Sequence, residues 1–83
     1  MSTVTPEHYT RIKEIVAKQI GVEFSALGDS THLVDELGVD SLKLIDVLSA
    51  IEMEFTIVID MEELPEMVNV EAIHRVTARA AGW

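Results

Sequence analysis

Residues 40–55 read DSLKLIDVLSAIEMEF, and this stretch indicates the fold most directly. Five apolar residues recur in it at spacings of three, three, three and four: Leu42, Ile45, Leu48, Ile51 and Phe55. Such spacing is typical of one face of an α-helix. Asp40 can cap this helix, because its carboxylate can accept hydrogen bonds from the N–H groups of the first turn. The stretch therefore predicts a helix that begins at Ser41 and has one apolar face.

A helix is also expected on each side of this stretch. The first begins with Thr5 as its cap and Pro6 at the first helical position, where a missing N–H costs nothing, and it ends at Gly21. The last is capped by Asn69 and turns four apolar residues inward: Val70, Ile73, Val76 and Ala80. Three amphipathic helices can enclose one small core.

The remaining segments connect these helices. Residues 22–39 show no sustained period and contain many turn-forming residues, so they predict a long loop. Five apolar residues can anchor it: Phe24, Leu27, Leu33, Val34 and Leu37. The segment Phe55-Thr56-Ile57-Val58-Ile59 is interpreted as a connection, and Asp60–Leu64, closed by Pro65, as a short helix. The predicted fold is an all-α four-helix bundle, a single domain over residues 1–83, with a short third helix and a long first loop.

The composition excludes several classes of function. The formal net charge of −9 repels nucleic acid and anionic membranes, and it favours partners with basic surfaces. The chain has no cysteine, so a thiol for thioester chemistry would have to be imported. No apolar run approaches the length of a membrane span, and no secretory leader is recognisable. We therefore expect a cytoplasmic protein, and its solvated acidic surface favours a monomer.

Few side chains suit catalysis. His8, His32 and His74 are far apart in the sequence and are interpreted as surface residues, so we expect no metal site. Ser41 lacks the glycine two residues later that is typical of a nucleophile elbow, and no histidine base is near it in sequence. We therefore expect no catalytic residue. By position alone, Ser41 is either an ordinary helix-start serine or an accessible site where a phosphate ester would lie in the favourable field of a helix N-terminus.

The segment Leu37-Gly38-Val39-Asp40-Ser41-Leu42 resembles the attachment motif of acyl carrier proteins, which places a phosphopantetheine-bearing serine at the start of the second helix. The resemblance extends over residues 5–80, through Leu33-Val34-Asp35-Glu36 upstream and through these residues downstream: Ile45, Asp46, Ile51, Glu52, Glu54, Phe55, Glu62, Glu63, Asn69 and Val70. It implies that a phosphopantetheinyl transferase uses coenzyme A and magnesium to attach 4′-phosphopantetheine to Ser41, flanked by Asp40 and Leu42. Acyl groups would then be carried as thioesters on the thiol of this arm.

The resemblance also implies partners and an acyl site. Synthase, reductase and acyltransferase enzymes with basic docking patches would bind charged residues of the second and third helices: Lys43, Asp46, Glu52, Glu54, Glu62 and Glu63. The acyl chain would withdraw between the helices into an aliphatic lining: Ile45, Leu48, Ile51, Ile59 and Val70. Any bundle needs such residues for its core, so this cavity is an added hypothesis.

Two residues depart from the pattern of fatty-acid carriers. Lys43 stands where these proteins usually have an acid, and Met53 replaces a usual glutamate. Residues 57–60 are also more apolar than usual and lack the proline often found at the position of Asp60. Type II fatty acid biosynthesis is the plain interpretation. The alternatives are a dedicated carrier for a polyketide, modified-lipid or aminoacyl pathway, and an acidic protein-interaction module that is never modified.

Overall fold

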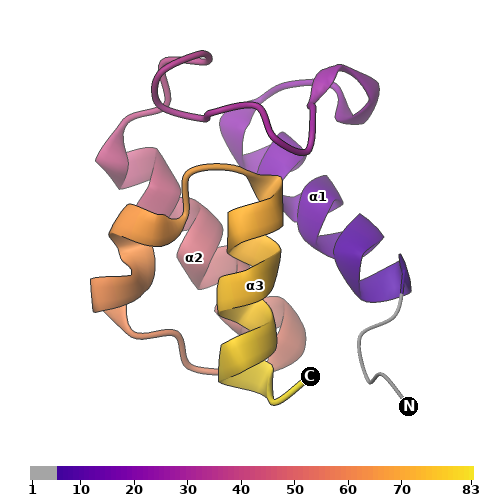
Figure 1. Ribbon diagram of the computed structural model, residues 1–83, viewed down its shortest axis with the longest axis vertical. Helices are drawn as coiled ribbons and strands as arrows, with labels where there is room; N and C mark the ends of the chain where they lie inside the picture. The colour runs from indigo at the N-terminus through magenta and orange to yellow at the C-terminus, as the bar shows by residue number, and fades with distance from the viewer. Residues whose placement is uncertain (1–5) are drawn as a thin grey trace.

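The computed structural model describes residues 6–83, and within them it contains helices and no strand (Figure 1). The elements are α1 (Pro6–Ile20), η1 (Phe24–Ala26), α2 (Ser41–Phe55), η2 (Met61–Glu66) and α3 (Val70–Ala81), where η marks a 3₁₀ helix. The predicted all-α bundle, with three longer helices and a short one before the last, is confirmed. The predicted cap Thr5 lies outside the described residues.

The helix ends follow from local sequence. Asn69 caps α3 as expected, because its Oδ1 accepts from the Ala72 N–H at 2.7 Å. At the predicted end of α1, Gly21 has φ +75°, a left-handed conformation that favours glycine. Thr56 adopts the same conformation after α2, with φ +54°, although it carries a side chain. A left-handed residue therefore ends both α1 and α2.

The core lies where the three long helices meet. Ile12 and Val16 of α1 are fully enclosed there, together with Ile51 of α2 and Ile73 of α3. Burial of each such side chain is worth roughly 1.5–3 kcal/mol, which makes this contact the main source of stability. No helix among residues 6–83 combines the length and the apolar character needed to cross a membrane.

The buried face of α2 differs from the predicted one. Its enclosed residues are Leu44, Val47, Leu48 and Ile51. Leu42 is exposed and Ile45 is half-buried. The reason is geometric: each residue advances about 100° around a helix, so a step of three residues falls about 60° short of a full turn. Three such steps lead from Leu42 to Ile51, and their shortfalls add up to about 180°. These two residues therefore lie on opposite sides of α2. The single apolar face predicted from Leu42 onward is therefore wrong at its start.

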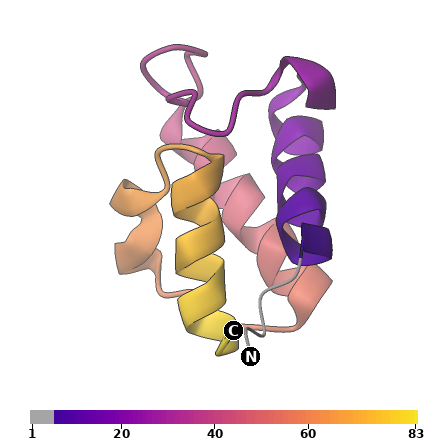
Figure 2. The same cartoon turned by 45° about the vertical axis from the view of Figure 1, so that its right-hand side comes forward.

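The loop over residues 22–39 crosses the end of the bundle where α2 begins (Figures 1 and 2). Two of its predicted anchors, Leu27 and Leu33, are buried, whereas the other three are exposed: Phe24, Val34 and Leu37. Backbone hydrogen bonds fasten the loop to the region before and at the start of α3. The Leu33 N–H donates to the Val68 carbonyl at 2.8 Å, and the Glu71 N–H donates to the Asp29 carbonyl at 3.2 Å.

The short helix η2 also differs in detail from its prediction. Asp60 caps it, with its Oδ1 accepting from the Glu62 N–H at 2.9 Å. The helix continues through Pro65 to Glu66 and does not end at Leu64. Proline removes only one donor from so short a helix, and the Met67 N–H still donates to the Leu64 carbonyl at 3.0 Å. The predicted end at Pro65 is therefore too early.

Candidate functional site

Ser41 is the first residue of α2 and is exposed. Asp40 before it has extended backbone angles, and its Oδ1 accepts from the Lys43 N–H at 2.9 Å. This bond satisfies one of the unpaired first-turn donors of α2 and fixes the direction in which the helix starts. The Ser41 end of α2 and the C-terminal Trp83 lie at opposite ends of the bundle (Figures 1 and 2).

The residues before Ser41 hold it at the surface. Gly38 has φ +68°, and its N–H donates to the Val34 carbonyl at 3.0 Å. The Val39 N–H donates to the Leu33 carbonyl at the same distance, and the Val39 side chain is buried. Because Val39 is anchored in the core, the next two residues, Asp40 and Ser41, face solvent. This arrangement holds Ser41 at an exposed position at the start of α2.

Ser41 fits a phosphate ester. Backbone N–H groups at a helix N-terminus carry partial positive charge and attract anionic oxygens. The Asp40 carboxylate lies next to this site and repels the negative charge of a phosphate on Ser41. The hydrogen bond from the Lys43 N–H offsets part of the negative charge of Asp40. Leu42, also exposed, lies immediately after Ser41 and gives the site an apolar neighbour. A serine hydroxyl in this setting can hold a phosphodiester without any change in the fold.

The charged residues predicted to bind partners have contacts inside the molecule. On α2, Lys43 Nζ is 3.7 Å from an Asp46 carboxylate oxygen. Glu52 Oε2 accepts from the Ile59 N–H at 2.7 Å, and Glu54 accepts from Arg11 of α1 at 2.8 Å.

The Arg11 contact lowers the pKa of the Glu54 carboxyl.

The predicted partner-binding residues of η2 differ in their contacts. Glu63 lies 2.5 Å from Arg79 of α3, and Glu62 is exposed.

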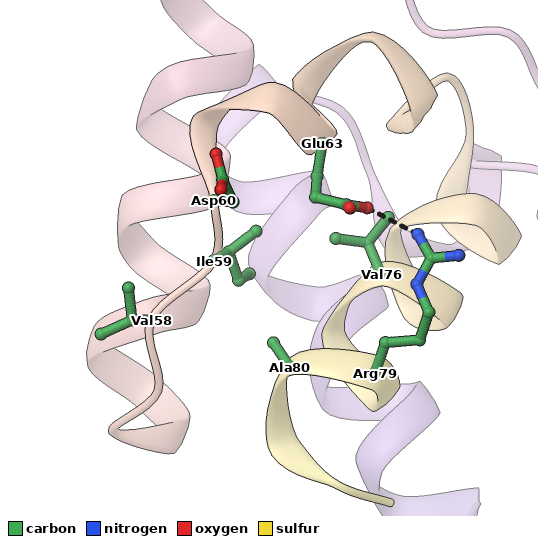
Figure 3. A pocket seen from close by; sticks show the side chains of 7 residues that line it. All are labelled: Val58, Ile59, Asp60, Glu63, Val76, Arg79 and Ala80. Atoms are coloured by element: carbon green, nitrogen blue, oxygen red, sulfur yellow. Dashed lines mark hydrogen bonds and ion pairs between the residues drawn. The ribbon is translucent and has the colours of Figure 1, made fainter.

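Most of the residues predicted to line an acyl cavity are packed in the core. Leu48, Ile51, Ile59 and Val70 are buried, and Ile45 is half-buried. A pocket of about 310 Å³ lies elsewhere, between the connection after α2, η2 and α3 (Figure 3). Its lining residues are Val58, Ile59, Asp60, Glu63, Val76, Arg79 and Ala80. Of the predicted lining, only Ile59 reaches this pocket.

The histidines are not all ordinary surface residues. His8 of α1 stacks on Trp83, with 3.8 Å between ring centroids and 9° between ring planes. His74 of α3 contacts the Tyr9 ring edge-on at 5.0 Å and lies 6.5 Å from Trp83. The expectation of three separated surface histidines is therefore wrong for this pair, because folding brings α1 and α3 together at Trp83. No group of three metal-binding side chains is found in the part of the chain that the structure describes.

Comparison with known proteins agrees with this geometry. Residues 10–75 match the protein family described as the phosphopantetheine attachment site. The chain is 33% identical over 64 residues to the acyl carrier protein of Thermotoga maritima, covering 77% of this chain and 79% of that protein.

It is also similar to a chain in a solved structure described as "The ishigamide ketosynthase/chain length factor". The two are 61% identical with a TM-score of 0.81, covering 95% of this chain and 100% of that one. Proteins of the matched family carry a covalent 4′-phosphopantetheine cofactor and are carriers, not enzymes. With its exposed helix-start serine in the attachment motif, the chain belongs to the acyl carrier protein family.

Proposed function

We propose that this protein carries acyl intermediates on Ser41 for a ketosynthase that works with a chain length factor, in a polyketide type of pathway. The observation that supports this pathway is the 61% identity, over 95% of the chain, to a chain in the ishigamide ketosynthase/chain length factor structure. Identity to the Thermotoga maritima acyl carrier protein is only 33%. The proposal therefore favours a dedicated carrier over one for type II fatty acid biosynthesis.

In this proposal, a phosphopantetheinyl transferase joins the Ser41 oxygen to the phosphorus of the pantetheine-linked phosphate of coenzyme A. The pyrophosphate bond of coenzyme A breaks, the Ser41 hydroxyl loses its proton, and adenosine 3′,5′-bisphosphate leaves. The arm supplies a terminal thiol, which the cysteine-free chain lacks, and this thiol holds the acyl group as a thioester. Asp40 fixes the start of α2, so that Ser41 stays exposed and close to the first-turn N–H groups. Leu42 adds an exposed apolar contact beside the attachment point.

The net charge of −9 draws the carrier toward the basic docking patches of its transferase, synthase, reductase and acyltransferase partners. The proposed contacts are the charged residues of α2 and η2: Lys43, Asp46, Glu52, Glu54, Glu62 and Glu63. Attraction of this kind acts over about 8–10 Å at physiological salt, so it guides the approach of a partner. The carrier works as a monomer in the cytoplasm under this proposal.

The acyl chain would lie among the aliphatic residues Ile45, Leu48, Ile51, Ile59 and Val70. Because four of these side chains are buried against one another, entry of the chain requires α2 and α3 to separate locally. Ile59 is the residue that connects this region to the pocket beside η2. It is the proposed point at which the interior opens.

The experiment compares two condensing enzymes. The carrier is loaded on Ser41 with the same acyl group and offered to a ketosynthase/chain length factor heterodimer and to a fatty-acid ketosynthase. We expect kcat/KM to be at least about tenfold higher with the heterodimer, a difference of about 1.4 kcal/mol. Equal or better transfer to the fatty-acid enzyme would assign the carrier to fatty acid biosynthesis and overturn the pathway.

A variant at Lys43 tests whether this residue determines which condensing enzyme accepts the carrier. Lys43→Glu restores the acid that fatty-acid carriers usually have, and it removes the partner of Asp46. We expect it to improve transfer to the fatty-acid ketosynthase, because it adds negative charge beside Ser41. Unaltered turnover would show that Lys43 does not influence the choice of enzyme.

A further inference from the structure

A second pocket, of about 220 Å³, lies between the end of η2 and α3. Its lining residues are Glu66, Val68, Arg75, Val76 and Arg79. It shares Val76 and Arg79 with the 310 Å³ pocket, so the two pockets are neighbours along α3. The second pocket differs from the first in its chemistry, because its lining contains two arginines and a single glutamate.

The two arginines of this pocket differ in their partners. They are four residues apart on α3, a spacing that places both side chains on the same side of the helix. Arg79 is held by two carboxylates of η2, those of Glu63 at 2.5 Å and Glu66 at 2.6 Å, and Figure 3 shows the first of these contacts. Arg75 pairs with no carboxylate among residues 6–83, not even with that of Glu71 one turn earlier on α3. Arg75 therefore offers the pocket guanidinium donors that an anionic ligand can use.

The charge and the shape of the lining suit a carboxylate on a short carbon chain. The pKa of the Glu66 carboxyl is lowered chiefly by its hydrogen bond from Arg79, and the charge of Arg75 also contributes, so Arg75 acts inside the pocket. A guanidinium binds a carboxylate through two parallel hydrogen bonds. Val76 is buried and Val68 is half-buried, and they give the pocket an apolar surface beside these charges.

Two backbone hydrogen bonds connect this pocket to the attachment segment. The Leu33 N–H donates to the Val68 carbonyl at 2.8 Å, and the Val39 N–H donates to the Leu33 carbonyl at 3.0 Å. Ser41 follows Val39 by two residues, so standard bond lengths place the Cα atoms of Val68 and Ser41 no more than about 20 Å apart. An arm on Ser41 that bears a four-carbon acyl group has about as many bonds in line as six extended residues, a reach of about 20 Å. The end of the acyl group therefore reaches the pocket.

We propose that this pocket binds the free carboxylate of an acyl group carried on the Ser41 arm, with the Arg75 guanidinium as the binding group. The inference rests on the proposed function, because it requires the arm on Ser41. It adds a class of cargo, namely an acyl group made from a dicarboxylic acid that is linked to the arm through one end. An acyl group with an uncharged end has no charge for Arg75 to bind and does not occupy this pocket.

The test compares two arms that differ only in charge. A phosphopantetheinyl transferase loads Ser41 from stable coenzyme A analogues, in which an amide replaces the thioester and bears either a succinyl group or the neutral succinamoyl group of the same size. Nuclear magnetic resonance at pH 7 and low salt follows the backbone amides of Val68 and Val76 and the Nε–H of Arg75. We expect all three signals to shift with the succinyl arm relative to the succinamoyl arm, and to lose most of this shift in 1 M salt.

Variants of exposed cations assign the effect to one side chain. Arg75→Gln should lose the succinyl-dependent shifts of Val68 and Val76, and Arg75→Lys should keep part of them, because it retains the charge without the planar fork. Lys18→Gln removes one positive charge from α1 instead and should keep the shifts in full. All three variants should keep a native unfolding transition, since both side chains are exposed.

Identical spectra for the two arms, or succinyl-dependent shifts that persist in Arg75→Gln, would overturn the inference and leave the carrier function intact. If equimolar free succinate shifts these signals in the unloaded protein and the succinyl arm does not, the pocket binds a carboxylate from solution and the inference is wrong. A native chain that gains no arm on Ser41 would overturn the proposed function, and this inference with it.

Discussion

The Glu52 carboxylate accepts a hydrogen bond from the Ile59 backbone N–H, with 2.7 Å between Oε2 and N. The bond joins the last turn of α2 to a residue seven positions later, across the left-handed Thr56. It is partly buried, so water replaces it poorly. Glu52 is thus a structural residue of the connection, and this role would compete with its proposed contact to a partner.

Replacing Glu52 by alanine should destabilise the protein. Loss of the acceptor leaves the Ile59 N–H without its partner, which costs about 1–3 kcal/mol of unfolding free energy. Glu52→Gln retains an oxygen at the same position and should recover most of the loss. Urea unfolding followed by the fluorescence of Trp83, the single tryptophan, measures both. Glu62→Ala, at an exposed carboxylate, is the matched control. If Glu52→Ala and Glu62→Ala are equally stable, the bond contributes nothing.

Variants of Asp40 should separate two roles of this residue, one as the cap of α2 and one in loading of the arm onto Ser41. Asp40→Ala removes the acceptor for the Lys43 N–H and should lower the unfolding free energy by about 1 kcal/mol. Asp40→Asn keeps an acceptor oxygen and should stay within a few tenths of a kcal/mol of the native value.

The rate of loading by a phosphopantetheinyl transferase is the second measurement. A carboxylate beside Ser41 can help the transferase hold magnesium, so we expect slower loading in Asp40→Asn even though its stability is native. Native loading of Asp40→Asn would limit Asp40 to capping α2.

The stability of the protein should fall in mild acid because of His74. Burial, and next the nearby His8 and Arg75, lower the pKa of His74. The unfolded chain therefore binds a proton at a higher pH than the folded protein does, and stability is lost as pH falls. The loss begins near the ordinary histidine value of about 6.5 and continues through the lowered folded pKa. The urea midpoint should therefore be nearly constant above pH ~7.5 and decrease below pH ~6.5.

His74→Gln is the control for this decrease, because glutamine does not titrate. Its urea midpoint should vary less than that of the native protein over the same pH range. The ion-paired carboxyls of Glu54 and Glu66 have a lowered pKa, so their contribution disappears only at pH values below about 4.3. An identical pH dependence in native protein and His74→Gln would show that another group is responsible.

Much of the fold follows from local sequence. The end of α1 and the starts of α2 and α3 were predictable, because Gly21, Asp40 and Asn69 act within a few residues through their backbone or side chains. The exposed position of Ser41 at the start of α2 was predictable for the same reason, since Ser41 and its neighbours form one continuous segment. The short helix was predicted to begin at Asp60, but Asp60 caps it and the helix begins at Met61. The end of η2 was harder to predict, because a 3₁₀ helix tolerates Pro65 near its end.

Other features depend on distant contacts. Contacts with α1 and α3 determine which side of α2 faces the core. Steps of three residues fall short of a full helical turn, so the regular spacing did not reveal that Leu42 lies on the exposed side. His8 meets Trp83 only after folding, across 75 residues of sequence, although His74 is only nine residues from Trp83. No local period marks such a cluster. The Glu52 bond to Ile59 likewise depends on the turn at Thr56.

Intact mass is the measurement that tests attachment at Ser41 most directly. The purified protein is incubated with coenzyme A, magnesium and a promiscuous phosphopantetheinyl transferase. Ser49→Ala, at another exposed serine of α2, is the matched control for Ser41→Ala. We predict that the native chain and Ser49→Ala each gain the mass of one phosphopantetheine, and that Ser41→Ala gains none. A native chain without this gain, or a Ser41→Ala variant with it, would contradict the carrier mechanism at Ser41.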